Sequence, residues 1–217
     1  MLIVNNKNKP AGGLKVRESQ SGAVYVQGLT KHPVDSYEMI AAKTDEGYNN
    51  RSIGSTLMNQ TSSRAHTIIT IEFKQIMQED GRKTEKFSVI NLVDLAGSEK
   101  AGQTGAEGAR LKEGCAINKS LTVLGTCISV LADKAMGKAK SSVVPYRDSN
   151  LTRILQNALG GNSKTIMICA ISPSSMNFEE SLSTLRYADR AKKIQNKAVV
   201  NESAQDKMIR ELKAENE

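Results

Sequence analysis

Two apolar segments separated by a turn signal constrain the fold of this chain more than any other feature. From His66 to Met77 apolar and polar residues alternate, as they do in a half-buried strand. The turn dipeptide Asp80-Gly81 follows, and residues 87–93 are then apolar almost throughout. This pattern predicts an antiparallel hairpin whose second strand is buried on both faces and ends at Asp94. Loops that follow strand ends form the ligand crevice of open α/β sheets, so residues 94–99 are a candidate site.

Strand and helix patterns alternate along the rest of the chain, which indicates an α/β fold. Further strands are predicted over residues 14–17, 24–29 and 165–171, the last of them buried. Helices are predicted over residues 36–46 (capped at Asp35 or Ser36 and stopped by Gly47), 111–132, 149–159 and 177–194. In the long helix one face carries Leu121, Leu124, Ile128 and Leu131. The last helix opens with the capping-box pattern Asn177-x-x-Glu180, and we expect it to bury Phe178, Leu182, Leu185 and Ala188.

Composition restricts the classes of protein that fit. The 217 residues suit one domain, and the net charge of +7 predicts an acidic partner. Aromatic residues make up only 4% and tryptophan is absent, which disfavours stacking on single-stranded nucleic acid. The apolar runs are too short to cross a membrane and no signal-peptide layout is present, so we expect a cytoplasmic protein. The three cysteines are widely spaced in apolar surroundings, which favours buried thiols over a metal site.

The glycine-rich stretch AGQTGAEG, residues 101–108, looks at first like a phosphate loop. That loop requires the pattern G-x-x-x-x-G-K-[ST], in which the lysine and the hydroxyl serve the terminal phosphate and magnesium. No lysine that precedes a serine or threonine in this sequence follows a glycine. The stretch therefore needs another explanation.

Five strings together resemble the motor domain of the kinesin superfamily, in the family's order and roughly its spacing. They are NQTSSRAH (59–66), DLAGSE (94–99), INKSL (117–121), VPYRDSNLTRIL (144–155) and LRYADRAKKI (185–194). The resemblance covers residues 14–200, and the tail resembles the class-three, vesicle-transport branch. It implies a partial kinesin-type P-loop NTPase fold, in which helices flank a central, mostly buried β-sheet. The glycine-rich stretch is then the loop between the second switch and the long relay helix.

The resemblance also implies a site for ATP or ADP with magnesium. Its switch and nucleotide residues are Asn59, Ser62, Ser63, His66, Asp94, Gly97 and Asn118. Catalysis would involve Ser63, Arg64, Gly97 and Glu99, with Arg64 and Glu99 forming a salt bridge between the switches. Ser63 and Asp94 would hold magnesium indirectly. Taken singly, Asp94 also suits a helix cap, Arg64 a solvated charge and His66 a structural role. Ala65 stands where the family usually has serine, and we expect this to alter local hydrogen bonding and the rate.

A second set of residues matches the family's microtubule-binding face. It consists of Arg110, Lys134, Lys138, Lys140, Tyr146, Arg147 and Arg153. Tubulin is acidic, so such cations would raise the encounter rate and give a salt-sensitive affinity. Without the family context, the basic loop is better explained as solvated surface.

The resemblance divides the chain into four parts. Residues 1–13 are a loop or frayed start, 14–194 the C-terminal portion of a motor domain, 195–202 the neck linker, and 203–217 the start of a neck helix. The family's motor domain extends further in the N-terminal direction, so we expect a C-terminal half that lacks the phosphate loop and binds ATP weakly when alone. A second copy joined through the neck is an implied partner, although an exposed helix also explains the tail.

Three functions remain open from the sequence. The first is a microtubule-stimulated ATPase that moves along microtubules, of which this chain is a part. The second is a microtubule-binding protein without hydrolysis, because the phosphate loop is absent. The third is a basic nucleic-acid binder, which the motifs disfavour. For the preferred function we expect no nucleic-acid partner, no membrane insertion and a location on the cytoskeleton.

Overall fold

The computed structural model describes residues 13–20, 22–52, 65–79, 82–97, 109–138 and 143–216. They belong to two compact units. The hairpin unit takes its described residues from Lys31–Ala96 and Val199–Glu217, and the helical unit takes its own from Val4–Thr30 and Gly97–Ala198.

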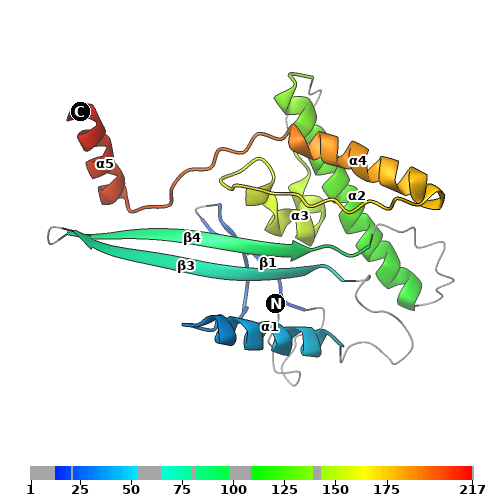
Figure 1. The fold of residues 1–217 in the computed structure, drawn as a ribbon, viewed down its shortest axis with the longest axis horizontal. Coiled ribbons are helices and arrows are strands. Elements are labelled where there is room, and N and C mark those ends of the chain that lie inside the picture. The colour runs from blue at the N-terminus through cyan, green and yellow to red at the C-terminus, as the bar shows by residue number, and fades with distance from the viewer. Residues whose placement is uncertain are drawn as a thin grey trace. The chain divides into compact units, whose positions relative to one another are not determined.

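The predicted hairpin is confirmed and is the main feature of the hairpin unit (Figure 1). Strand β3 (Thr67–Glu79) pairs antiparallel with β4 (Arg82–Asp94) in continuous register, from Thr67 opposite Asp94 to Glu79 opposite Arg82. Only residues 80 and 81 lie between the strands, as expected for a two-residue connection. The second strand begins at Arg82 rather than at Phe87, because the residues from Arg82 to Lys86 pair with those from Glu79 back to Gln75 in β3.

Burial of the strands differs from the prediction. Val89, Ile90, Leu92 and Val93 of β4 are 40% to 54% exposed, because no third strand joins β3 and β4 among the described residues. Residues 165–171 form no strand, and Ile166 and Ile168 are 89% and 92% exposed. An apolar run forms a strand only where a neighbour completes its hydrogen-bond ladder. The α/β class is confirmed, but the described strands form two two-stranded sheets rather than one central buried sheet.

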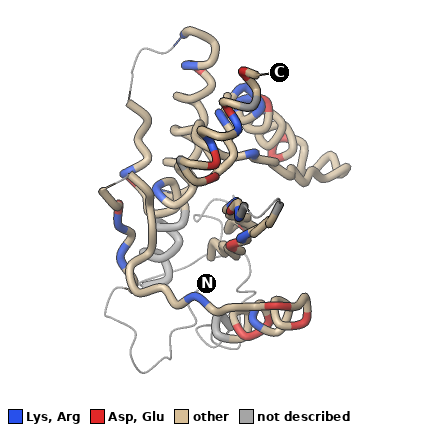
Figure 2. Tube along the Cα trace, turned by 90° about the vertical axis from the view of Figure 1, so that its left-hand side faces the viewer, with Lys and Arg blue, Asp and Glu red and all other residues tan. Residues whose placement is uncertain are grey.

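Two helices complete the hairpin unit. Helix α1 (Tyr37–Ser52) is capped by Ser36, whose Oγ accepts from the Met39 amide at 3.3 Å. It continues through Gly47, so the predicted stop is wrong; a glycine inside a helix costs only about 1 kcal/mol relative to alanine. Charges of both signs lie along this helix (Figure 2), including the Lys43–Glu46 pair at 2.8 Å. Helix α5 (Ala204–Asn216) follows the segment predicted as neck linker.

The long helix α2 (Ala109–Ala135) is the central element of the helical unit. Its core consists of Leu124, Cys127, Ile128 and Ala132 from α2 with Leu151, Leu155 and Leu159, which confirms the predicted apolar face at Leu124 and Ile128. The Cys127 thiol is fully buried, and this burial raises its pKa to about 11. The other elements are β1 (Val16–Glu18), β2 (Val24–Val26), η4 (Tyr146–Asp148), α3 (Asn150–Ile154), η5 (Gln156–Ala158), η6 (Ser175–Asn177) and α4 (Phe178–Lys192). Two short strands were predicted in this segment, and the observed β1 and β2 pair antiparallel.

Helix α4 packs on α2 (Figure 1), and of its predicted inward residues Leu182 and Ala188 are half-buried. The Asn177 side chain caps nothing, because its Oδ1 accepts from the Ser172 hydroxyl at 3.4 Å. Phe178 and Leu185, which were expected to face inward, are exposed. Instead the Tyr187 ring lies against Gly125 of α2, and burial raises the pKa of its hydroxyl.

Candidate functional site

The open end of the β3–β4 hairpin brings two of the predicted motifs together. His66 immediately precedes β3, and Ala96 lies two residues beyond the end of β4. The Ala96 amide donates to Nδ1 of His66 at 3.0 Å. Ala96 is almost fully buried, and Thr67 opposite Asp94 is buried as well. A direct hydrogen bond therefore joins the two motifs that the resemblance assigned to the nucleotide switches, residues 59–66 and 94–99.

His66 is held in its neutral form at this position. Burial lowers the pKa of its imidazole, and Nδ1 accepts a hydrogen bond, so the ring proton resides on Nε2. A neutral ring that accepts from a backbone amide orients the chain after β4. This contact supports a positioning role for His66, which the sequence had placed among the nucleotide-switch residues.

Asp94 ends β4, and its side chain is exposed beside this contact. Among the described residues, no three His, Cys, Asp or Glu side chains are grouped so that they could hold a metal ion directly. A single carboxylate with free oxygens suits contact with magnesium through a bound water, since magnesium keeps several of its waters. The donor chemistry at Asp94 thus fits the indirect role expected from the sequence.

Several predicted site residues lie outside the described residues: Asn59, Ser62, Ser63, Arg64, Glu99 and Lys140. Arg110 lies within α2, but its side chain is also outside them. Gly97 follows Ala96 and is half-buried. Asn118 belongs to the helical unit and lies in α2, where its carbonyl accepts from the Thr122 hydroxyl at 2.8 Å. The structure thus joins His66 with the chain after Asp94.

The residues predicted to contact microtubules differ in the exposure and in the contacts of their side chains. Lys134 and Lys138 are exposed at the end of α2 and just beyond it. The Arg147 side chain is 79% exposed and reaches Glu18 at 3.0 Å. By contrast, the Tyr146 hydroxyl donates to the Leu159 carbonyl, and the Arg153 guanidinium contacts the Val16 carbonyl at 3.4 Å. Tyr146 and Arg153 thus serve the packing of the helical unit, whereas Lys134, Lys138 and Arg147 are exposed.

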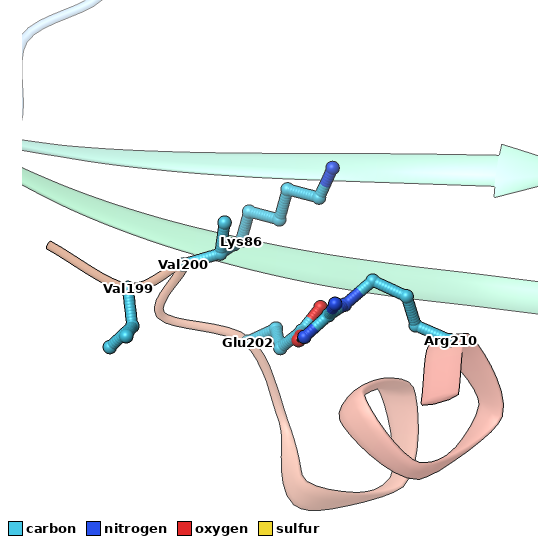
Figure 3. Close-up of a pocket in the computed structure, with 5 residues that line it drawn as sticks. All are labelled: Lys86, Val199, Val200, Glu202 and Arg210. Atoms are coloured by element: carbon cyan, nitrogen blue, oxygen red, sulfur yellow. The ribbon is translucent and has the colours of Figure 1, made fainter. Parts of the chain in front are cut away.

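The segment predicted as neck linker has contacts in both units that the sequence did not reveal. In the helical unit, the Asn196 amide group donates to the carbonyls of Ala158 and Ser163 and accepts from the Gly160 amide at 2.7 Å. In the hairpin unit, the Phe87 amide donates to the Asn201 carbonyl at 3.0 Å, and Glu202 bridges to Lys86 of β4. Figure 3 shows this second region. A lone asparagine after a helix was the only sequence signal for the first contact.

Residues 2–194 match the family model of the kinesin motor domain. The chain belongs to the kinesin motor domain family. Kinesin-related protein 1 of Dictyostelium discoideum is 56% identical over 215 residues, which is 98% of this chain and 10% of that protein. Kinesin-like protein unc-104 of Caenorhabditis elegans is 55% identical over 208 residues, or 94% of this chain and 13% of that protein.

A solved kinesin structure agrees with these matches. It is described as a KIF14 dimer in a two-heads-bound state, with AMP-PNP and in complex with a microtubule. It matches this chain with a TM-score of 0.81 at 46% identity, covering 92% of this chain and 55% of that one. This kinesin chain spans only about a tenth of the length of its curated relatives: 10% of kinesin-related protein 1 and 13% of unc-104. The unc-104 relationship agrees with the predicted class-three branch. In the described part of this kinesin, no helix is long and apolar enough to span a membrane.

Proposed function

We propose that the protein containing this chain is a microtubule motor that couples ATP hydrolysis to movement, and that this chain supplies its switches and its track-binding face. The observation that carries this proposal is the hydrogen bond from the Ala96 amide to His66, at 3.0 Å. It joins the ends of two motifs that the sequence assigned to the two nucleotide switches. A motor requires such a linkage, because a change at one switch must reach the other.

The proposed roles around the nucleotide follow from the chemistry of each residue. ATP with magnesium would supply the phosphoryl group for transfer to water when bound. Asp94 would orient water molecules on the metal ion, and Gly97 would present its backbone amide to the γ-phosphate without a side chain in the way. Arg64 and Glu99 would pair to close the site and exclude bulk water. Asn59, Ser62, Ser63 and Asn118 would donate to or accept from the phosphates and the metal-bound waters.

The track-binding face would rest mainly on Lys134, Lys138 and Arg147, whose charges are exposed. Arg110 and Lys140 remain members of this set by sequence. Tyr146 and Arg153 would contribute indirectly, because their contacts with Leu159 and Val16 hold the helical unit together. The related structure described as bound to a microtubule supports the acidic polymer as the partner.

Residues 195–202 would act as the neck linker, which docks and undocks with the nucleotide state. The contacts of Asn201 and Glu202 with β4 support a docked arrangement. In α5 the apolar residues Met208, Ile209 and Leu212 are exposed, and they would pair with a second copy of the chain in a neck coiled coil. The protein would then reside on microtubules in the cytoplasm.

One sequence observation favours a second function. The 217 residues contain no phosphate-loop pattern. If the whole protein also lacks one, it would bind microtubules without hydrolysing ATP.

Steady-state ATP hydrolysis by the whole protein, with and without microtubules, tests the proposal. We expect microtubule-stimulated turnover that Asp94→Asn lowers at least about tenfold, because the variant loses the charge that orients metal-bound water. Asp35→Asn removes a charge elsewhere in the hairpin unit and serves as the control. Unchanged turnover in Asp94→Asn would refute the role of Asp94. Microtubule binding without any turnover would favour the second function.

A further inference from the structure

An ion pair connects helix α5 to the segment that precedes it, and the carboxylate of this pair is nearly buried. Arg210 donates from Nε and from Nη2 to Oε1 of Glu202, at 3.0 Å and 2.8 Å. The Glu202 side chain is only 6% exposed, although the Arg210 side chain is 60% exposed. The pair raises the pKa of Arg210, so the guanidinium stays charged. Figure 3 shows the two side chains meeting between the strand and the helix.

Asp206 makes a second contact between this helix and β4. The Ser203 hydroxyl accepts from the Asp206 amide at 3.1 Å and donates to Asp206 Oδ2 at 2.7 Å. The same Oδ2 accepts from the backbone amide of Glu85 at 3.4 Å. Asp206 therefore takes part both in the helix cap and in a contact with the outer edge of the hairpin.

These two contacts lie next to the backbone pairing of Asn201 and Glu202 with β4. Glu202 bridges to Lys86, and the neighbouring Asn201 carbonyl accepts from the Phe87 amide at 3.0 Å. The side chain that secures Glu202 comes from Arg210, eight residues later and two turns into α5. Pairing on β4 and helix formation thus share the same residues.

We propose that Glu202, Asp206 and Arg210 form a clasp that makes the pairing of Asn201 and Glu202 with β4 and the folding of the first turns of α5 one cooperative event. Arg210 is a positioning residue: it holds Glu202, and Glu202 holds the strand pairing. When the clasp opens, the segment leaves β4 and the start of α5 loses its anchor at once. The consequence for movement, namely that the neck helix is released together with the neck linker, rests on the proposed function.

Amide hydrogen exchange of the full chain, resolved residue by residue, tests the clasp without microtubules or ATP. The reporters are the amides of Phe87 and Glu85, which face Asn201 and Asp206, and the amide of Ile90, which lies opposite Ile71 in the β3–β4 ladder. In Arg210→Gln we expect exchange at Phe87 and Glu85 to accelerate about three- to tenfold, with Ile90 unchanged. Arg210→Lys keeps the charge and should restore part of the protection.

Lys207→Gln is the matched control, because Lys207 lies one turn earlier on α5 and has only a 3.9 Å contact with the exposed Glu211. Wild-type exchange at Phe87 and Glu85 in Arg210→Gln would overturn the proposal. Equal acceleration at Ile90 would also overturn it, since that would indicate general loss of hairpin stability rather than opening of a clasp. Neither result would bear on ATP hydrolysis or microtubule binding, so the proposed function would stand or fall separately.

Discussion

His66 shows how a single side chain can connect two motifs that are 30 residues apart in the sequence. It supplies the acceptor for an amide that is otherwise cut off from water, since Ala96 is only 5% exposed. In His66→Ala that amide would lose its partner, and we expect the free energy of unfolding to fall by about 1–3 kcal/mol. His66→Asn keeps an acceptor near the Nδ1 position and should lose less. Urea denaturation at pH 7.5 would compare the three proteins, and equal losses in both variants would contradict this role.

The pH dependence at His66 has a definite sign. Burial lowers the pKa of this group in the folded state below the usual value of about 6.5. Between the two pKa values the unfolded chain binds more protons, so stability is full above pH of about 6.5 and falls as the pH drops below it. We expect wild-type stability to decrease between pH 7.5 and 5.5 more than that of His66→Asn. The same decrease in both proteins would assign the effect to other groups.

Arg147 is one of the exposed cations predicted to contact a microtubule. Its side chain is 79% exposed and has one contact with Glu18. In the whole protein we expect Arg147→Gln to weaken microtubule affinity about two- to fivefold, as for one exposed charge pair. Lys43→Gln changes the net charge equally but lies in α1, outside the predicted face. Equal weakening by both substitutions, measured by co-sedimentation, would show only an effect of net charge.

At the scale of elements, local signals predicted the hairpin, α2 and a helix over residues 149–159, where the structure has α3 followed by η5. The Ser149 Oγ caps α3 by accepting from the amides of Leu151 and Thr152. Predictions failed where distant residues decide the outcome. Residues 165–171 are apolar but find no strand partner among the described residues. The Asn177 side chain is bound by Ser172, which a local capping pattern does not reveal.

The candidate site was predictable only in part. Its residue types and their order were visible in the sequence, and Asp94 was placed at a strand end. The bond between His66 and Ala96 depends on the full register of the hairpin, which the sequence pattern did not specify residue by residue. The clasp from Arg210 to Glu202 depends on a segment that returns to β4 from more than a hundred residues away.

Two glycines in the helical unit should respond oppositely to alanine. At Gly125, inside α2, a Cβ would lie 3.7 Å from the Tyr187 ring, an ordinary contact. We expect Gly125→Ala to raise the free energy of unfolding by about 0.5–1 kcal/mol, because alanine favours the helix. At Gly161 a Cβ would lie 2.8 Å from the backbone of Asn157. Gly161→Ala should therefore lower the free energy of unfolding by about 1–3 kcal/mol. Urea denaturation would measure both, and destabilisation by Gly125→Ala would contradict the α2–α4 packing described.

At the scale of the whole molecule, the exposed apolar residues of β3 and β4 are its most unusual feature. Phe73, Ile76, Val89 and Leu92 are between 46% and 54% exposed. Exposed apolar surface of this kind is typical of a face that packs against further structure. The chain matches 55% of the related KIF14 chain. The residues proposed for the switches and for the track-binding face all belong to this chain.

Co-sedimentation of the 217-residue chain with microtubules, with and without ATP, tests the central claim most directly. We expect the chain to pellet with microtubules at low salt, to dissociate as salt screens its exposed lysines and arginines, and to ignore ATP because its sequence carries no phosphate-loop pattern. A folded chain that stays in the supernatant at low salt would contradict the assignment of the track-binding face. Release by ATP would contradict the claim that this chain lacks a working phosphate site.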